Sequence, residues 1–224
     1  MNRDEKRARV AGRPPALQVT AGRQVLCPSE PTGGTWIALN ESGASFALVN
    51  WYSVPGKMTA SSVSRGIVVA AVAHLTNPGT VTNALREMPL SRVNPFRLVG
   101  IFPQDQLAVE WRWNLSSLDC EDRGWSTRQW ISSGFDELTA QRLRSEEFRR
   151  LQRQPKAGNL DWLRQLHRSH ANGPGPFSTC MHREDAATVS YTEVSVSDRA
   201  ATMAHWVGPP CQSTSCTLHQ LELR

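Results

Sequence analysis

The chain has 224 residues, of which 39% are hydrophobic and 20% charged, so it can bury a sizeable core and is not a disordered chain. No run approaches the ~20 apolar residues that a membrane helix needs, and the charged first ten residues carry no apolar secretory signal. The formal net charge of +5 does not indicate a nucleic-acid-binding protein, because all but three of the 25 basic residues are arginines and they are scattered. The densest group, residues 142–153, also contains acids and is interpreted as a solvated helix face.

The first half of the chain predicts a loop, a hairpin, two helices and two further strands. Residues 11–34 contain four prolines and are expected to form a loop. Residues 35–39 and 45–51 are rich in β-formers and flank turn residues, which predicts a β-hairpin. The remaining elements are helices over 64–75 and 81–88, and strands over 96–102 and 107–113.

The second half predicts helices followed by more strands. A strand is expected over 126–131, and Ser133-x-x-Asp136 resembles the N-cap of a helix that runs to about Leu151. A further helix is expected over 159–170, and strands over 187–196, 200–207 and 215–223. Strands and helices do not alternate regularly, which favours an α+β layered sandwich with mostly antiparallel sheets over a doubly wound parallel sheet. We expect one domain over residues 1–224.

Five cysteines, an odd number, and the lack of a secretory signal favour a reduced, cytoplasmic setting. Cys180-x-His182 and Cys211-x4-Cys216 contain residue types that zinc prefers, but the spacings fit no structural zinc module. We therefore expect no metal site and no cofactor. Cys180 and His182 lie two apart on a predicted strand and face one side. A nucleophile pair or a haem ligand is the alternative to a packed thiol beside a hydrogen-bonded histidine, which we favour.

Several blocks of sequence resemble one family. Asn2-Arg3-Asp4-Glu5 resembles the signature of the NRDE family, which includes the eukaryotic transport and Golgi organisation protein two. Other blocks that resemble family motifs are Gly33-Gly34-Thr35-Trp36, Ala47-Leu48-Val49-Asn50, Ser64-Arg65-Gly66 and Phe96-Arg97-Leu98. Ser132-Ser133-Gly134 and Cys180-Met181-His182-Arg183 resemble a bacterial branch of the family. Together the blocks span nearly the whole chain.

The resemblance implies the four-layer αββα sandwich of the N-terminal-nucleophile hydrolases, such as bile-salt hydrolases and penicillin V acylases. It also implies an acyl-amide substrate. The hairpin over residues 40–50 resembles the acylase hairpin whose closing Asn, here Asn50, helps form the oxyanion hole. The resemblance assigns catalytic roles to Arg3, Asp4 and Asn50. Binding roles fall to Asn2, Glu5, Ser133, His182 and Arg183. The structural alternatives are an exposed charged N-terminus, a turn-capping Asn50 and a helix-capping Ser133.

The start of the chain departs from the family pattern. Family members begin Met-Cys and reach N-R-D-E through a strand hairpin, whereas this chain begins within the motif. We expect the nucleophile and the first strands to be missing, so the sequence leaves open whether the chain is an enzyme. The alternative is a non-catalytic carrier of haem or lipid in trafficking or membrane organisation. Arg3, Asp4 and Glu5 are then expected to be loosely held rather than buried, next to an open sheet edge. The sequence predicts no oligomeric state.

Overall fold

The computed structural model describes residues 1–56 and 62–224. These residues form two β-sheets and four α-helices, which confirms the predicted α+β class. Their contacts divide the chain into two compact units, each built from separate segments. The first unit contains Met1–Ala11, Thr127–Glu193 and Ala204–Thr217, and the second contains Gly12–Ser126, Val194–Met203 and Leu218–Arg224. The single domain over residues 1–224 stays a prediction.

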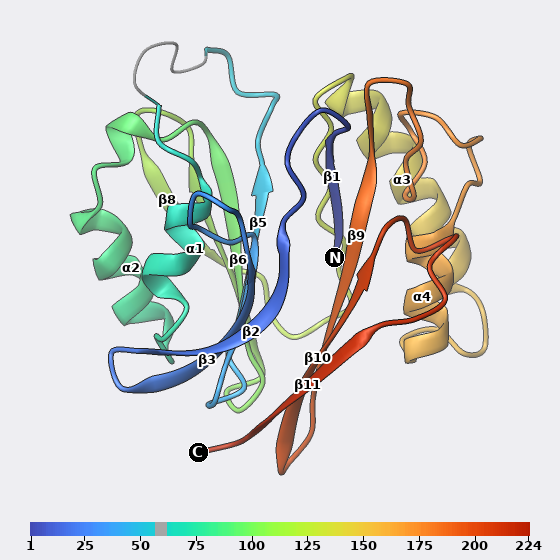
Figure 1. Ribbon diagram of the computed structural model, residues 1–224. Coiled ribbons are helices and arrows are strands. Elements are labelled where there is room, and N and C mark those ends of the chain that lie inside the picture. Colours follow the sequence, from blue (N-terminus) through green and yellow to red (C-terminus); the bar gives the residue numbers. More distant parts are fainter. Residues whose placement is uncertain (57–61) are drawn as a thin grey trace. The chain divides into compact units, whose positions relative to one another are not determined.

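The second unit is built on a seven-stranded sheet in which strands follow one another in chain order. Every neighbouring pair is antiparallel. Two α-helices and one 3-10 turn lie between the fourth and fifth of these strands in the chain (Figure 1). The strands are β2 (Arg13–Thr20), β3 (Arg23–Ser29), β4 (Ile37–Asn40), β5 (Ser45–Asn50), β6 (Phe96–Phe102), β7 (Leu107–Trp113) and β8 (Leu118–Asp122). The helices are α1 (Gly66–Val72), α2 (Pro78–Glu87) and the 3-10 turn η1 (Leu90–Arg92).

The helices α1 and α2 cover one face of this sheet and form its main core (Figure 1). Val68, Val69 and Val72 of α1 are fully buried with the strand residues Phe46 and Phe96. The valine-rich run 64–75 fits a helix or a strand by composition, and here burial against the sheet outweighs the weak helix propensity of β-branched residues.

Asn40 fixes the predicted hairpin to the end of α1. Its Nδ2 donates to the carbonyls of Ala73 and Leu75 at 3.0 and 2.9 Å, which supplies partners to backbone groups at the helix C-terminus. Its Oδ1 accepts from the backbone N–H of Ser42 at 3.1 Å inside the turn. Asn40 itself is fully buried, and its bond to Ala73 is buried with it. The turn residue therefore also acts as a helix cap.

Two glycines bring the hairpin and α1 together at backbone distance. Gly34 has a φ of +83°, which a residue with a side chain rarely adopts. The N–H of Thr35 donates to the carbonyl of Gly66 at 3.1 Å. A Cβ on Gly66 would lie 3.0 Å from the nitrogen of Thr35. The glycines of two sequence blocks that resemble the family thus have a packing role.

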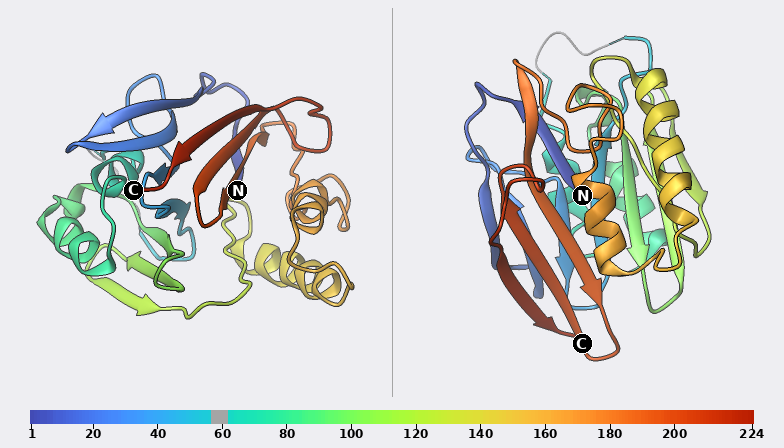
Figure 2. Two further views of the ribbon diagram at one scale, coloured as in Figure 1. Left: turned by 90° about the horizontal axis from the view of Figure 1, so that it is seen from below. Right: turned by 90° about the vertical axis from the view of Figure 1, so that its right-hand side faces the viewer.

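The first unit combines part of a four-stranded sheet of order β1-β9-β10-β11 with two helices. The helix α4 lies against β9, where the rings of His167 and Tyr191 are 4.8 Å apart and Arg164 forms an ion pair with Glu193 at 2.9 Å. The helices α3 and α4 pack through Leu151, Trp162 and Leu166 (Figure 2). The elements are β1 (Asn2–Lys6), α3 (Glu137–Gln152), α4 (Leu160–Arg168), β9 (Ala186–Val196), β10 (Ala200–Val207) and β11 (Thr217–Glu222).

Three sequence predictions are wrong. Residues 11–34 contain the strands β2 and β3 instead of a loop. Pro14 and Pro15 are accommodated because β2 is an edge strand and its register shifts between Arg13 and Ala16. Residues 126–131 form no strand, and the last strand of that sheet is β8. The N-cap of α3 is Asp136 instead of Ser133, and the Asp136 carboxylate accepts from the N–H of Thr139 at 3.0 Å.

The other predicted elements are present with shifted ends. The strands over 96–102 and 107–113 are confirmed, as are the hairpin over 35–51 and the three C-terminal strands. Among residues 1–56 and 62–224, no helix combines the length and the apolar character needed to cross a membrane.

Candidate functional site

The NRDE segment forms the edge strand β1 of the first unit and pairs antiparallel with β9. The register shifts between Arg3 and Asp4, because Arg3 pairs with Ser190 whereas Asp4 pairs with Thr188. Such a bulge changes the direction in which a side chain points. Arg3 is only 8% exposed, so the expectation that it is loosely held is wrong. The pairing of β1 with β9 holds this segment in place, which the sequence alone did not predict.

Asn2 joins β1 to the segment around α4. Its Nδ2 donates to the carbonyl of His167 at 3.0 Å and to the carbonyl of Thr179 at 2.7 Å. Its Oδ1 lies 3.1 Å from Nδ1 of His167. The amide of Asn2 thus makes three internal contacts, and its binding role stays a prediction.

Asp4 is the centre of a polar cluster that also contains Thr188 and Arg144. The hydroxyl of Thr188 donates to Oδ1 of Asp4 at 2.6 Å. The same hydroxyl accepts from the N–H of Met181 at 2.9 Å, so its proton is directed at the carboxylate. The guanidinium of Arg144, from α3, lies 4.0 Å from Oδ2 of Asp4. Side chains from two other elements, β9 and α3, therefore orient this carboxylate of β1.

Burial disfavours the charged forms of both Asp4 and Arg144. Partial withdrawal from water raises the pKa of Asp4, and Arg144 and Thr188 act in the opposite direction. Burial likewise lowers the pKa of Arg144, against the effect of Asp4. The Asp4 side chain is 28% exposed, whereas that of Arg144 is 8% exposed. Asp4 is thus the member of the cluster that a ligand can reach.

Arg144 is held in place by main-chain carbonyls. Its guanidinium donates to the carbonyls of Ser132, Pro176 and Phe177 at 3.1 to 3.4 Å. The interpretation of the arginine-rich segment 142–153 as a solvated face is therefore wrong for this residue. The sequence did not predict the burial of Arg144, because no local pattern distinguishes it from the exposed arginines of α3.

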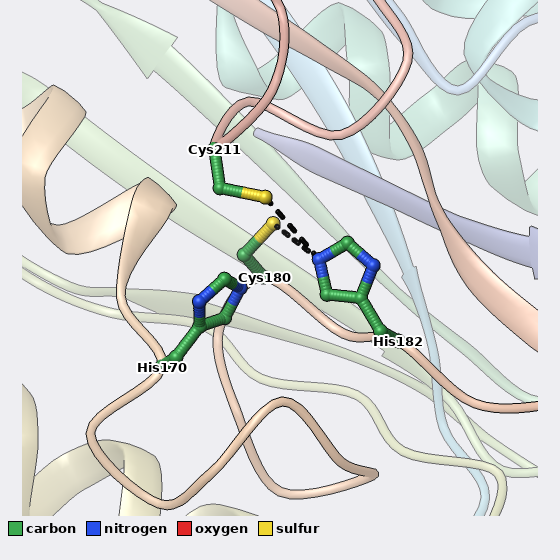
Figure 3. Close-up of side chains that lie close together, drawn as sticks. All are labelled: His170, Cys180, His182 and Cys211. Carbon is green, nitrogen blue, oxygen red and sulfur yellow. Dashed lines mark hydrogen bonds between the residues drawn. The ribbon is translucent and has the colours of Figure 1, made fainter.

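A second group of side chains, the thiol–imidazole cluster, consists of His170, Cys180, His182 and Cys211 (Figure 3). Nε2 of His182 lies 3.6 Å from the sulfur of Cys180 and 3.2 Å from that of Cys211. The rings of His170 and His182 are arranged edge to face, with their centroids 5.1 Å apart. Cys216, which the sequence pairs with Cys211, is exposed and is not part of the cluster.

The thiol of Cys180 is not an activated nucleophile. Burial raises the pKa of Cys180 to about 12, so the thiol is protonated at neutral pH. Burial also lowers the pKa of His182. The role of Cys180 as a packed thiol stays a prediction.

The polar cluster and the thiol–imidazole cluster adjoin along the chain. Met181, whose N–H donates to Thr188, lies between Cys180 and His182. The charge of Asp4 also acts on His182, where it favours the protonated ring. The two groups therefore share one region of the first unit.

The remaining predicted site residues have local contacts. Glu5 receives Arg9 at 2.8 Å and Arg3 at 3.5 Å. Arg183 forms an ion pair with Asp185 at 2.8 Å and lies over the ring of Phe135. The binding roles of Glu5 and Arg183 stay predictions.

Ser133 and Asn50 were predicted at element ends. Ser133 is 9% exposed and accepts from the N–H of Phe135 at 3.4 Å. Asn50, at the end of β5 in the second unit, donates from Nδ2 to the hydroxyl of Tyr52 at 2.9 Å. Their roles in a site stay predictions.

The fold is that of the acylases whose hairpin the sequence resembles. The chain is similar to penicillin V acylase from Agrobacterium tumefaciens, with a TM-score of 0.51 at 12% identity over 91% of this chain and 70% of that one. It is also similar to a mutant of the conjugated bile acid hydrolase from Clostridium perfringens, with a TM-score of 0.46 at 9% identity over 91% and 78% of the two chains. At such low identity the first likeness shows the fold alone.

The sequence pattern of the family described as Transport and Golgi organisation 2 matches residues 1–153. This match covers more than half of the chain, and the chain therefore belongs to that family. The resemblance drawn from the NRDE signature is confirmed. No curated protein sequence matches the chain.

Proposed function

We propose that the protein binds a small molecule that carries an acyl-amide bond, with Asp4 as the carboxylate that receives the ligand's polar group. The observation that carries the proposal is the orientation of Asp4 by Thr188 and Arg144 on the strand that bears the family signature. A partly exposed carboxylate accepts hydrogen bonds from amide N–H groups. The fold shared with penicillin V acylase supports an acyl-amide as the ligand class.

Hydrolysis of such a ligand requires a nucleophile and a base in addition to binding. Cys180 is not suited to this role because its pKa of about 12 keeps the thiol protonated. We propose hydrolysis only for a form of the protein in which a cysteine precedes the NRDE segment.

The five free cysteines support a cytoplasmic location, which we also propose.

Binding is tested by calorimetric titration of the protein with penicillin V and with a glycine-conjugated bile acid. We expect at least one to bind to the wild-type protein. Asp4→Ala should weaken that binding about ten-fold or more, because the ligand loses its acceptor. The matched control is Asp161→Ala, which removes an acid of α4 that is 87% exposed. The absence of binding to wild type, or an equal loss in both variants, would contradict the proposal.

Hydrolysis is tested separately, by release of a primary amine. The DNA upstream of the Met1 codon is read, and any in-frame segment with a cysteine is added to the chain. Turnover by the extended protein, lost when that cysteine is changed to serine, would establish the hydrolase. Turnover that persists after the cysteine is changed to serine would exclude this cysteine as the nucleophile.

A further inference from the structure

The thiol–imidazole cluster gathers four metal-ligating side chains from three segments of the first unit (Figure 3). His170 follows the end of α4, Cys180 and His182 precede β9, and Cys211 lies between β10 and β11. Their ligand atoms all lie within 4.8 Å of one another. Residues so far apart in the chain do not converge in this way through local structure.

The distances approach those of a tetrahedral zinc site. Zn–S bonds of about 2.3 Å and Zn–N bonds of about 2.0 Å place neighbouring ligand atoms about 3.3 to 3.8 Å apart. Nε2 of His182 lies 3.6 Å from the sulfur of Cys180 and 3.2 Å from that of Cys211. Two of the distances between ligand atoms are therefore already close to those of a tetrahedral zinc site.

The fourth side chain provides an independent indication of a ligand. Nε2 of His170 is buried and has no hydrogen-bond partner within the described part of the chain. A buried polar nitrogen without a partner is costly. A metal ion at the centre of the cluster would supply that partner.

We propose that His170, Cys180, His182 and Cys211 form a structural site for one Zn²⁺ ion. Two sulfur and two nitrogen ligands are the donor set that Zn²⁺ prefers in structural sites. Binding displaces the protons of both thiols to solvent, and the two thiolates balance the charge of the ion. Four protein ligands leave no open position, so the site holds the fold and does no chemistry. The sequence expectation of no metal site rested on spacing alone, and Cys211 with His170 replaces the Cys216 that the spacing offered.

The ion would connect the end of α4, the segment before β9 and the loop before β11. Because Met181 lies between two ligands and donates to Thr188, the site also supports the residues that orient Asp4. The site does not depend on the proposed acyl-amide ligand, and its test measures metal rather than activity.

The protein is prepared without metal under reducing conditions and titrated with Zn²⁺ and with Co²⁺. We expect one ion per chain, a rise in melting temperature with Zn²⁺, and for Co²⁺ the thiolate charge-transfer and tetrahedral d–d absorption bands. Cys211→Ser and His170→Ala should each weaken binding at least about ten-fold and reduce the thermal shift. The matched control is Cys216→Ser, which changes an exposed cysteine of the same loop and should bind as the wild type does.

Three results would overturn the proposal. The first is a Co²⁺ spectrum without thiolate bands, and the second is an equal loss of binding in Cys216→Ser and Cys211→Ser. The third is a disulfide between Cys180 and Cys211 in protein isolated under reducing conditions. Haem is titrated in parallel, because imidazole and thiolate also bind haem iron. A Soret shift that is lost in His170→Ala, with no Zn²⁺ binding, would assign the cluster to haem instead.

Discussion

Asn2 and His167 are joined by two hydrogen bonds, one to the main chain and one to the ring. Nδ2 of Asn2 donates to the carbonyl of His167 at 3.0 Å, and Oδ1 lies 3.1 Å from Nδ1 of His167. The carbonyl belongs to the last turn of α4, where helix carbonyls lack partners within the helix. The first residue of the family signature is therefore a cap for a helix that follows it by more than 150 residues.

Removal of this amide should destabilise the first unit. We expect Asn2→Ala to lower the free energy of unfolding by about 1–3 kcal/mol, because two partly buried carbonyls lose their donor. Asn2→Asp should cost more, since a carboxylate would face those carbonyl oxygens. Urea denaturation measures both, with the exposed Asn172→Ala as the control. Equal stability of Asn2→Ala and the control would refute the capping role.

His167 should make stability depend on pH. Burial holds its pKa well below 6.5 in the folded chain, so the unfolded chain binds the proton more readily. The free energy of unfolding should therefore fall as the pH drops below 6.5, by up to about 1.4 kcal/mol per pH unit for this group. His167→Gln should reduce this slope between pH 7.5 and 5.5 in urea denaturation. An unchanged slope would show that His167 does not cause it.

Asn40→Ala should be among the more damaging changes in the second unit. The carbonyls of Ala73 and Leu75 would lose their donor in a fully buried position, which costs about 2–4 kcal/mol. The control is Asn83→Ala on the exposed side of α2, for which a change within about 0.5 kcal/mol is expected. Chemical denaturation compares the two, and a difference below about 1 kcal/mol between them would contradict the helix-capping role of Asn40.

Gly66→Ala should separate the hairpin from α1. The added Cβ would lie 3.0 Å from the backbone nitrogen of Thr35, which cannot move aside as a side chain can. We expect a loss of about 1–3 kcal/mol. Gly175→Ala is the matched control, since a Cβ there meets nothing within 4 Å. If thermal melts place both variants at the same midpoint, the close approach has no energetic weight.

Local patterns predicted the elements whose stability is local. The hairpin of β4 and β5 was predicted because turn chemistry and strand composition lie in one short stretch. The strand β2 was not predicted because Pro14 and Pro15 are typical of a loop. Prolines are tolerated in an edge strand, but the sequence does not show that β2 lies at the edge of its sheet.

The candidate site was predicted only where a motif named it. Asp4 entered through the family signature. Arg144, Thr188 and His170 carry no signal of their own, because each acquires its role from a residue distant in the chain. Spacing rules for zinc modules likewise describe ligands that are close in the chain, and they overlook ligands that come from separate connecting segments.

The pairing of β1 with β9 has a consequence for the order in which the protein can acquire its structure during synthesis. The hydrogen bond between Asp4 and Thr188 joins residues 184 positions apart. A ribosome releases the NRDE segment long before its partner strand, so the signature lacks that partner while the intervening residues are made. A nascent chain that ends at residue 153 already contains the whole stretch that identifies the family, yet its first strand still lacks β9. The segment by which the family is recognised can thus complete its strand pairing only after β9 has been made.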